Sequence, residues 1–482
     1  MVRDRDARGE IAVARNALTE KPEEKWHPAR LIPVVGIRGA QEQEQRATSA
    51  LLAAMGIVPS FGKAILAYLS APAGRISTFT EIQFEDEDGK AIPDGAIIVE
   101  WGKTRWVCLV EVKTGDGELT SEQVNRYMGV AVANGFDAVL TISNQLVSSP
   151  DALPYAPNKA LHKKLKAVRH LSWFRILTEA VIEYQHHGIS DPEQAWILGQ
   201  LIDYLDHENS GAGGFEGMGA EWVTVRNSAR QRTLRPGDKG VGEVAKDWEQ
   251  FVEYLCLGLR QSLGREVTPV YPKKSDARSR LQAHRDNLGI HKKLEATIKV
   301  PDAVGNIKVE ADLATRQVTT SVDVKPPKEG KAKTRINWLL KQLKEVPPDT
   351  RIEVKFPFSR EITSALVSQA QKSIDTVLLA SDPKKEPSAF VVAVTRAMGE
   401  KRGKDYGSFA AVAREQVLDF YRDVVQNLTG IRPGETDRDM KFSLDTVNCL
   451  GCCALGPVME IDEQHLGKLA PSMAADMLKN YE

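Results

Sequence analysis

The sequence lacks long apolar runs, a strong excess of charge and a nucleotide-binding fingerprint. No uninterrupted apolar stretch approaches the ~20 residues that a transmembrane helix needs, so we expect no membrane span. The mixed charges of the first residues lead into no apolar core, so we expect no secretory signal and a cytoplasmic protein. Lys and Arg number 64 against 65 Asp and Glu, which argues against a uniformly basic nucleic-acid coat. Without the fingerprint, neither NAD nor ATP binding is predicted.

Cysteine is scarce and unevenly placed, with five residues in a chain of 482. An odd number argues against a disulfide framework. Cys108 and Cys256 stand alone in apolar segments, whereas Cys449, Cys452 and Cys453 crowd into one short segment. This clustering predicts a metal or redox role for the segment near the carboxyl end.

The length predicts about three domains, and 42% hydrophobic with 27% charged residues is typical of a globular protein. Glycines concentrated after residue 210 mark the clearest linker. We expect a polar arm, a first α/β domain, a glycine-rich linker with a basic strip, a second α/β domain and a small terminal module, at residues 1–38, 39–207, 208–242, 243–400 and 401–482.

The first domain has the pattern of a mixed sheet covered by helices. Helical and alternating periodicities predict a helix, three strands, a helix and a strand, at residues 40–55, 78–84, 97–99, 106–112, 119–134 and 138–142. Two further helices are expected over 170–186 and 193–205. The helix between the last two strands is typical of a crossover in a helix-covered sheet.

Three charged residues in this domain are expected to converge. Glu111 and Lys113 are two apart on a strand, so their side chains emerge on the same face. A turn near Lys103 brings Asp94 across from them as a cross-strand neighbour. Two acids and a lysine at strand ends suit a hard cation such as Mg²⁺, which takes a few carboxylates and keeps several waters.

Pro93-Asp94 with Glu111-Val112-Lys113 resembles the motif of the PD-(D/E)XK nuclease superfamily, and Gln123 with Tyr127 resembles the Gln-x-x-x-Tyr signature of RecB-like members. The likeness covers about residues 40–205. It implies a restriction-endonuclease-like mixed sheet and Mg²⁺- or Mn²⁺-dependent cleavage of DNA or RNA. In that family Asp94 and Glu111 would hold the metal and Lys113 would assist the attacking water. Gln123 and Tyr127 would position the substrate strand.

Two further features bear on this resemblance. Superfamily members also use an acid on the first helix, for which Glu42 and Glu44 both qualify. Two groups of basic residues could either neutralise the phosphates of a partner or lie on solvent-exposed helix faces. The basic residues in question form one run between the acids at 151 and 179 and a second after the linker: Lys159, Lys163, Lys164, Lys166, Arg169 and Arg175, then Arg226, Arg230, Arg232 and Arg235.

The second domain is expected to repeat the element order of the first without a residue-level repeat. Its helices and strands are predicted at 243–262, 294–300, 307–313, 318–324, 335–343, 351–356, 361–373 and 390–394, with a basic connector over 278–293. Asp302 and the pair Asp323 and Lys325 imitate the first motif. A turn near Thr315, however, pairs Asp323 with residues near Ile307 that carry no carboxylate. We therefore predict a scaffold or binding domain, with a degenerate relative of the first domain as one option.

The cysteine segment is similar to a different family. Cys449-Leu450-Gly451-Cys452-Cys453, within residues 428–481, resembles the second cysteine motif of the thioredoxin-like [2Fe–2S] component of NADH:quinone oxidoreductases and related hydrogenases. The resemblance implies a partial thioredoxin-like module with Cys449 and Cys453 as cluster ligands. The family's upstream cysteine pair is missing here. Three interpretations stay open: a module without a cluster, a cluster shared with a second copy or partner, and Zn²⁺ held by the three close thiols.

The main interpretation is a metal-dependent nuclease that uses Asp94, Glu111 and Lys113. One alternative is an iron–sulfur electron-transfer or redox-sensing protein that acts through Cys449 and Cys453. Another is a non-catalytic scaffold that binds nucleic acid or a protein partner.

Overall fold

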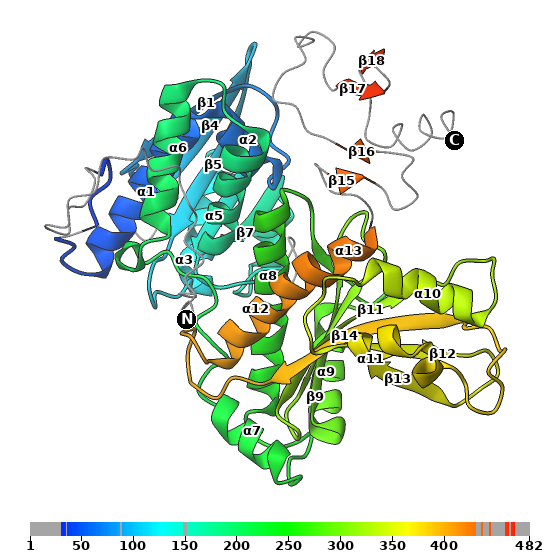
Figure 1. Cartoon of the computed structure of the whole chain (residues 1–482). Coiled ribbons are helices and arrows are strands. Elements are labelled where there is room, and N and C mark those ends of the chain that lie inside the picture. Colours follow the sequence, from blue (N-terminus) through cyan, green and yellow to red (C-terminus); the bar gives the residue numbers. More distant parts are fainter. Residues whose placement is uncertain are drawn as a thin grey trace, which may run out of the picture.

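Two β-sheets, each covered by helices, organise the part of the chain that the structure describes (Figure 1). The computed structural model describes residues 30–34, 36–86, 89–147 and 152–429. Beyond them it describes four short strands in two hairpins: β15 (Glu435–Thr436) with β16 (Ser443–Leu444), and β17 (Val458–Ile461) with β18 (Gln464–Gly467). The α/β class expected from the sequence is confirmed.

The first sheet is mixed and has the strand order β1-β4-β5-β6-β7. Its strands are β1 (Arg75–Thr80), β4 (Gly95–Trp101), β5 (Thr104–Val112), β6 (Ala138–Ser143) and β7 (Ala167–Ser172). β1, β4 and β5 pair antiparallel, whereas β5, β6 and β7 pair parallel. All six residues of β6 are buried, as expected for a central strand that is covered on both faces.

Helices cover both faces of this sheet. The face that carries Cys108, Val110 and Val112 packs against α1 (Ala40–Ile57), α2 (Pro59–Ala67), α5 (Trp173–Val181) and α6 (Pro192–Leu205). The opposite face packs against α3 (Ser121–Ala133), which begins where the Thr120 side chain accepts a hydrogen bond from the amide of Gln123. A hairpin of β2 (Phe84–Asp86) and β3 (Gly89–Ala91) and the short α4 (Lys159–His162) complete the domain.

Two predicted elements of this domain are wrong in detail. The strand expected over 78–84 is interrupted, because Glu81 takes a left-handed backbone conformation with φ 58° between β1 and β2. The helix expected over 170–186 starts as strand β7, which pairs with β6. The helix α5 begins only after Ser172, whose side chain accepts a hydrogen bond from the amide of Arg175. A π-helical stretch, Ile182–His187, follows α5.

The second sheet is antiparallel throughout and has the order β13-β12-β14-β11-β10-β9-β8. Its strands are β8 (Thr268–Pro269), β9 (Lys293–Lys299), β10 (Ile307–Asp312), β11 (Gln317–Val324), β12 (Thr350–Lys355), β13 (Ile362–Leu366) and β14 (Ala389–Ala397). The two domains were expected to share the same order of helices and strands, but the second sheet is antiparallel whereas the first is mixed. Consecutive hairpins build β9, β10 and β11, whereas the first sheet links β5 to β6 through a helix.

The helices of the second domain are α7 (Trp222–Arg230), α8 (Val241–Leu263), α9 (Ala277–His291), α10 (Ala332–Gln342), α11 (Val367–Lys372), α12 (Phe409–Phe420) and α13 (Gln426–Thr429). A short 3₁₀ turn, Ile374–Val377, and a π-helical turn, Tyr421–Val425, complete it, whereas the 3₁₀ turn Glu208–Ser210 follows α6 and contacts the first domain. The connector expected over 278–293 is mostly the helix α9, which starts with a capping box of Asp276 and Ser279. The helix expected over 361–373 is wrong, because Ile362–Leu366 pairs as β13 and only α11 is helical.

The glycine-rich segment after residue 210 is anchored rather than free. Phe215, Met218 and Trp222 are buried in the core of the second domain. The two domains also meet directly, where α5 packs against α8 (Figure 1). There Arg175 pairs with the buried Glu253, and Arg260 pairs with Glu179 at 3.0 Å.

No single helix in the described residues combines the length and apolar composition that crossing a membrane requires. The pair α1 and α2, bent by 110°, reaches that length and composition only when the two are taken together.

Candidate carboxylate–lysine site and cysteine module

A tight hairpin places Asp94 beside the end of β5. The β4–β5 register pairs Trp101 with Thr104 across Gly102, whose φ of 59° suits glycine, and pairs Gly95 with Val110. Asp94 comes just before β4. Its Oδ2 accepts a hydrogen bond from the amide of Val112 at 2.7 Å.

Lys113 links two carboxylates from different elements. Its Nζ donates to Glu111 Oε1 at 2.9 Å and to Glu44 Oε1 of α1 at 3.0 Å. Of the two acids that the sequence left open on this helix, Glu44 therefore reaches the cluster. Glu42 instead pairs with Arg46 and accepts a hydrogen bond from the amide of Arg38.

The two signature residues of α3 contact the protein itself. Gln123 Nε2 donates to Glu111 Oε1 at 2.6 Å, so it holds that carboxylate in place. The Tyr127 ring is buried and its hydroxyl donates to the Ile92 carbonyl at 3.1 Å, just before Pro93 and Asp94. The structure thus brings all five predicted residues together, with Gln123 and Tyr127 in positioning contacts.

Burial dominates the electrostatics of the cluster. It raises the pKa of Glu111 to about 8, and the charge of Asp94 beside it adds to the rise. Burial also raises the pKa of Asp94 and that of Glu44. For Lys113, burial alone would lower the pKa, but the attraction of Glu111 and Glu44 outweighs it and raises the pKa. The Lys113 ammonium group therefore contacts two carboxyl groups, and its charge also acts on Asp94.

The donor set fits a cation held by two carboxylates. The second oxygen of Glu111, Oε2, is buried and has no hydrogen-bond partner among the described residues. Asp94 lies beside it, and carboxylate oxygens are the ligands that Mg²⁺ and Mn²⁺ prefer. No group of three or more His, Cys, Asp or Glu side chains in the described part of the chain is arranged to hold a metal. Water would have to complete the coordination of any ion bound here.

An opening lies next to the cluster. A cleft of about 880 Å³ is lined by Gln43 on α1 and by the loop Thr114, Gly115, Asp116 and Gly117 after β5. Gln43 directly precedes Glu44 and Thr114 directly follows Lys113, so the cleft borders the segments that carry the cluster.

The basic residues predicted to neutralise phosphates do not form one surface. Arg175 pairs with the buried Glu253, Lys166 pairs with Asp137, and Arg226 is buried in the second domain. The structure therefore gives the predicted DNA or RNA partner no continuous basic face from these residues.

The cysteines fall into two groups. Cys108 and Cys256 are fully buried, in the cores of the first and the second domain, and burial raises the pKa of both thiols. Thiols in such surroundings are inert, and these two lie in different cores. Cys449, Cys452 and Cys453 lie outside the described residues.

A family model matches the last part of the chain. The family model of thioredoxin-like [2Fe–2S] ferredoxins matches residues 416–482. A subunit of an NADH-quinone oxidoreductase of Rhizobium meliloti (strain 1021) is 37% identical over 57 residues, which are 12% of this chain and 34% of that protein. The HndA subunit of the NADP-reducing hydrogenase of Solidesulfovibrio fructosivorans is 35% identical over 48 residues, 10% and 28% of the two chains. No solved structure matches.

These matches correct the main interpretation. The description of the chain as a nuclease is wrong, because the matched family and relatives are an iron–sulfur ferredoxin family and components of oxidoreductases. These matches give no support to the Mg²⁺ expected at Asp94 and Glu111 or to a DNA or RNA partner. The restriction-endonuclease-like fold of the first domain is not confirmed, since no solved structure matches. The chain spans about a third of the length of the curated relatives that it matches. The expectation from the cysteine segment is confirmed: the carboxyl-terminal residues match a thioredoxin-like [2Fe–2S] module.

Proposed function

We propose that this chain is an electron-transfer or redox-responsive protein whose terminal module takes part in binding a [2Fe–2S] cluster through Cys449 and Cys453. The family match over residues 416–482, which includes both cysteines, carries this proposal. The names of its relatives, components of an NADH-quinone oxidoreductase and of an NADP-reducing hydrogenase, point to the same chemistry. A [2Fe–2S] cluster supplies one-electron transfer.

The cysteine count bears on how such a cluster is completed. A [2Fe–2S] cluster of this kind takes four thiolates. Three cysteines are available in the terminal segment, and the two buried ones cannot approach it without unfolding a core. We therefore propose that the remaining ligands come from a second copy of the chain or from a partner protein.

Iron analysis tests this proposal directly. Protein purified without oxygen is expected to contain iron and acid-labile sulfide, to absorb visible light and to give an electron paramagnetic resonance signal on reduction. Cys449→Ala and Cys453→Ala are expected to remove the iron, whereas Cys452→Ala is the matched control and should retain it. Iron-free, colourless wild-type protein, both as isolated and after reconstitution with iron and sulfide, would overturn the proposal. A cluster shared between copies predicts half a cluster per chain in a dimer.

The geometry of the first domain supports a second proposal, that Asp94 and Glu111 bind a divalent cation. The buried, unpartnered oxygen of Glu111 beside Asp94 carries it. Lys113 and Gln123 would hold the Glu111 carboxylate in place, and Tyr127 would hold the backbone ahead of Asp94. A cation bound there lowers the pKa of its bound water.

Calorimetric titration with Mn²⁺ or Mg²⁺ separates this site from the surface acids. Glu111→Gln keeps the size and the hydrogen bond from Gln123 but removes the charge, so the affinity is expected to fall at least tenfold. Glu42→Gln is the control on the same helix as Glu44, because Glu42 lies outside the cluster. Equal binding by both variants would show that the cation sits elsewhere.

A further inference from the structure

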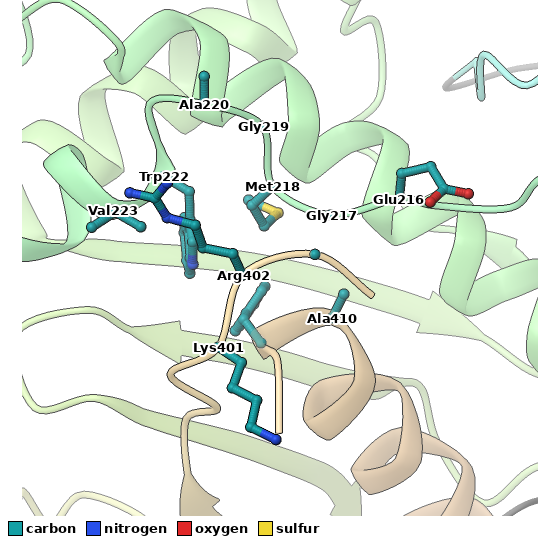
Figure 2. Close-up of a pocket in the computed structure, with 12 residues that line it drawn as sticks. Glu216, Gly217, Met218, Gly219, Ala220, Trp222, Val223, Lys401, Arg402 and Ala410 are labelled. Atoms are coloured by element: carbon teal, nitrogen blue, oxygen red, sulfur yellow. The ribbon is translucent and has the colours of Figure 1, made fainter. Parts of the chain in front are cut away.

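A second cavity lies in the other domain, far from the carboxylate–lysine site. It has a volume of about 230 Å³ and lies between residues 216–223, the loop 401–403 and the start of α12 (Figure 2). Glycines allow the two loops to meet. Gly217 has φ 133°, and a Cβ built on it would lie 3.1 Å from the Cα of Gly403. The cavity wall is therefore fixed by close backbone contact.

A buried donor that lines this cavity lacks an acceptor, and a second such donor lies one helical turn away, outside the lining. Trp222, which lines it, is only 4% exposed, and its Nε1 has no hydrogen-bond partner among the described residues. Arg226 follows one turn later on the same face of α7, is 7% exposed, and leaves its Nε without a partner in the described residues. Its Nη1 donates to the Glu400 carbonyl at 3.3 Å, which fixes it beside the loop that begins with Lys401. Buried donors without acceptors are costly, so each is a sign of an absent acceptor.

Positive charge gathers around these donors. Arg402 lines the cavity, and its side chain is exposed to solvent. In Figure 2 its side chain extends to the same side as Trp222 and Val223. Burial lowers the pKa of Arg226, and the charges of Arg316 and Arg402 lower it further, whereas Glu400, which pairs with Arg316, acts in the opposite direction. Glu216, an acid at the rim, is already neutralised by Lys404 at 2.8 Å.

The start of α12 adds a third kind of donor. The Ser408 side chain caps this helix by accepting a hydrogen bond from the amide of Ala411, which leaves the amides of Phe409 and Ala410 in the uncapped first turn. Both residues line the cavity. A helix of 12 residues places its positive dipole end there, where oxyanions bind readily.

We propose that this cavity binds a small phosphate-bearing compound. The Trp222 indole on α7, the basic side chains of Lys401 and Arg402 and the start of α12 come from different elements. A tetrahedral oxyanion offers acceptors in several directions where a planar carboxylate does not. The volume is below the roughly 300 Å³ at which pockets for drug-sized ligands begin, so a small ligand is favoured. Trp222 and Phe409, with ring centroids 4.7 Å apart, give an apolar wall beside the phosphate.

Nuclear magnetic resonance of the tryptophan indole groups tests the site on the full chain. The protein has eight tryptophans, and Trp222→Phe identifies the Trp222 resonance by its loss. Inorganic phosphate and pyrophosphate, titrated with a chelator present to exclude cation-mediated binding, are expected to shift that resonance selectively. Arg402→Gln is expected to weaken binding about tenfold, because it removes a charge-assisted contact.

A matched control separates specific binding from bulk charge. Arg360 is an exposed arginine at the far end of the second domain, between β12 and β13, so Arg360→Gln should leave the affinity unchanged. A Trp222 resonance that neither anion moves would overturn the proposal. Equal weakening by Arg402→Gln and Arg360→Gln would also overturn it, since binding would then follow net charge alone. Loss of the iron–sulfur cluster or of cation binding would leave this result unaffected.

Discussion

Glu111 in the first sheet and Asp323 in the second belong to the same short pattern, an acid two residues before a lysine, yet they occupy opposite environments. The Glu111 side chain is 2% exposed and bonds to Lys113 and Gln123. Asp323 is 45% exposed and pairs with Lys308 on the neighbouring strand β10 and with Lys355 on β12, which lies beyond β14. The pattern alone therefore does not make a site.

Register and covering helices account for the difference. In the first domain the hairpin brings Asp94 to Glu111, and α1 and α3 close over the pair. In the second, Ile307 pairs with Val322, so no acid stands across from Asp323. Asp302 is 85% exposed and pairs with Arg265. Burial raises interaction energies because water no longer screens the charges, so only the first set can shift pKa values strongly.

The largest expected effect lies where the two domains meet. Arg175→Met leaves the buried Glu253 without its partner and removes the hydrogen bond to the Tyr68 hydroxyl. The free energy of unfolding is expected to fall by about 4 kcal/mol. Arg265→Met, which breaks the exposed pair with Asp302, should cost less than about 1 kcal/mol. Urea denaturation of both variants checks this, and equal losses would contradict the contrast between buried and exposed pairs.

Lys113→Met tests the cluster itself. It leaves Glu111 and Glu44 without their shared ammonium group, and we expect a loss of about 3 kcal/mol at neutral pH without divalent cations. The loss is smaller than for Arg175 because Glu111, with its pKa raised to about 8, can take up a proton.

The second domain supplies the control for this variant. Lys325 occupies the equivalent place in the pattern but is exposed, so Lys325→Met should change the free energy of unfolding by less than about 0.5 kcal/mol. Similar losses in the free energy of unfolding for Lys113→Met and Lys325→Met would contradict the prediction, because the charges around Lys113 would then interact no more strongly than those around Lys325.

His170 gives the first domain a pH dependence. It is 1% exposed, and its Nε2 lies 2.8 Å from the Gln145 carbonyl while its Nδ1 lies 3.2 Å from Thr141 Oγ1. Nε2 therefore donates and Nδ1 accepts, which is the neutral form. Burial lowers the pKa of His170 from 6.5 to about 4.

The sign of the effect follows from this lowered pKa. Between pH 6.5 and 4, His170 is protonated in the unfolded chain but stays neutral in the folded chain. The contribution of neutral His170 to the free energy of unfolding is therefore complete above pH 6.5 and is lost as the pH falls. The loss should reach about 2 kcal/mol at pH 5. Urea midpoints from pH 7 to 5 should decline for the wild type and stay flatter for His170→Gln. The exposed His291→Gln should follow the wild type.

The sequence predicted those parts of the site that depend on local register. The turn at Gly102 and the alternation of β4 and β5 suffice to bring Asp94 to Glu111, and the spacing of Gln123 and Tyr127 places both on one face of α3. The choice of Glu44 over Glu42 could not be read from local pattern, because it depends on how α1 crosses the sheet.

Long-range packing explains the rest of what the sequence did not reveal. The cavity at Trp222 and Arg402 joins segments 180 positions apart, and neither carries a recognisable motif. Strand β13 depends on pairing with β12 and overrides a helical pattern. The family match begins at Gln416 in α12, yet Phe420 and Val424 are buried in the second domain's core. We therefore propose that the terminal module starts after α13 rather than at residue 401.

Helix caps give the smallest effects and extend the comparison to local structure. α3 in the first domain is capped by Thr120, whereas α10 in the second begins after Lys331 with no side-chain cap. Thr120→Ala is expected to cost about 1 kcal/mol, because the Gln123 amide loses its acceptor. Lys331→Ser should stabilise the second domain by about 0.5–1 kcal/mol through a new acceptor and the removal of a positive charge from a helix start. A lower urea midpoint for Thr120→Ala together with a higher one for Lys331→Ser would show that a side-chain cap stabilises each of these helix starts. Shifts of the same sign in both variants would contradict this.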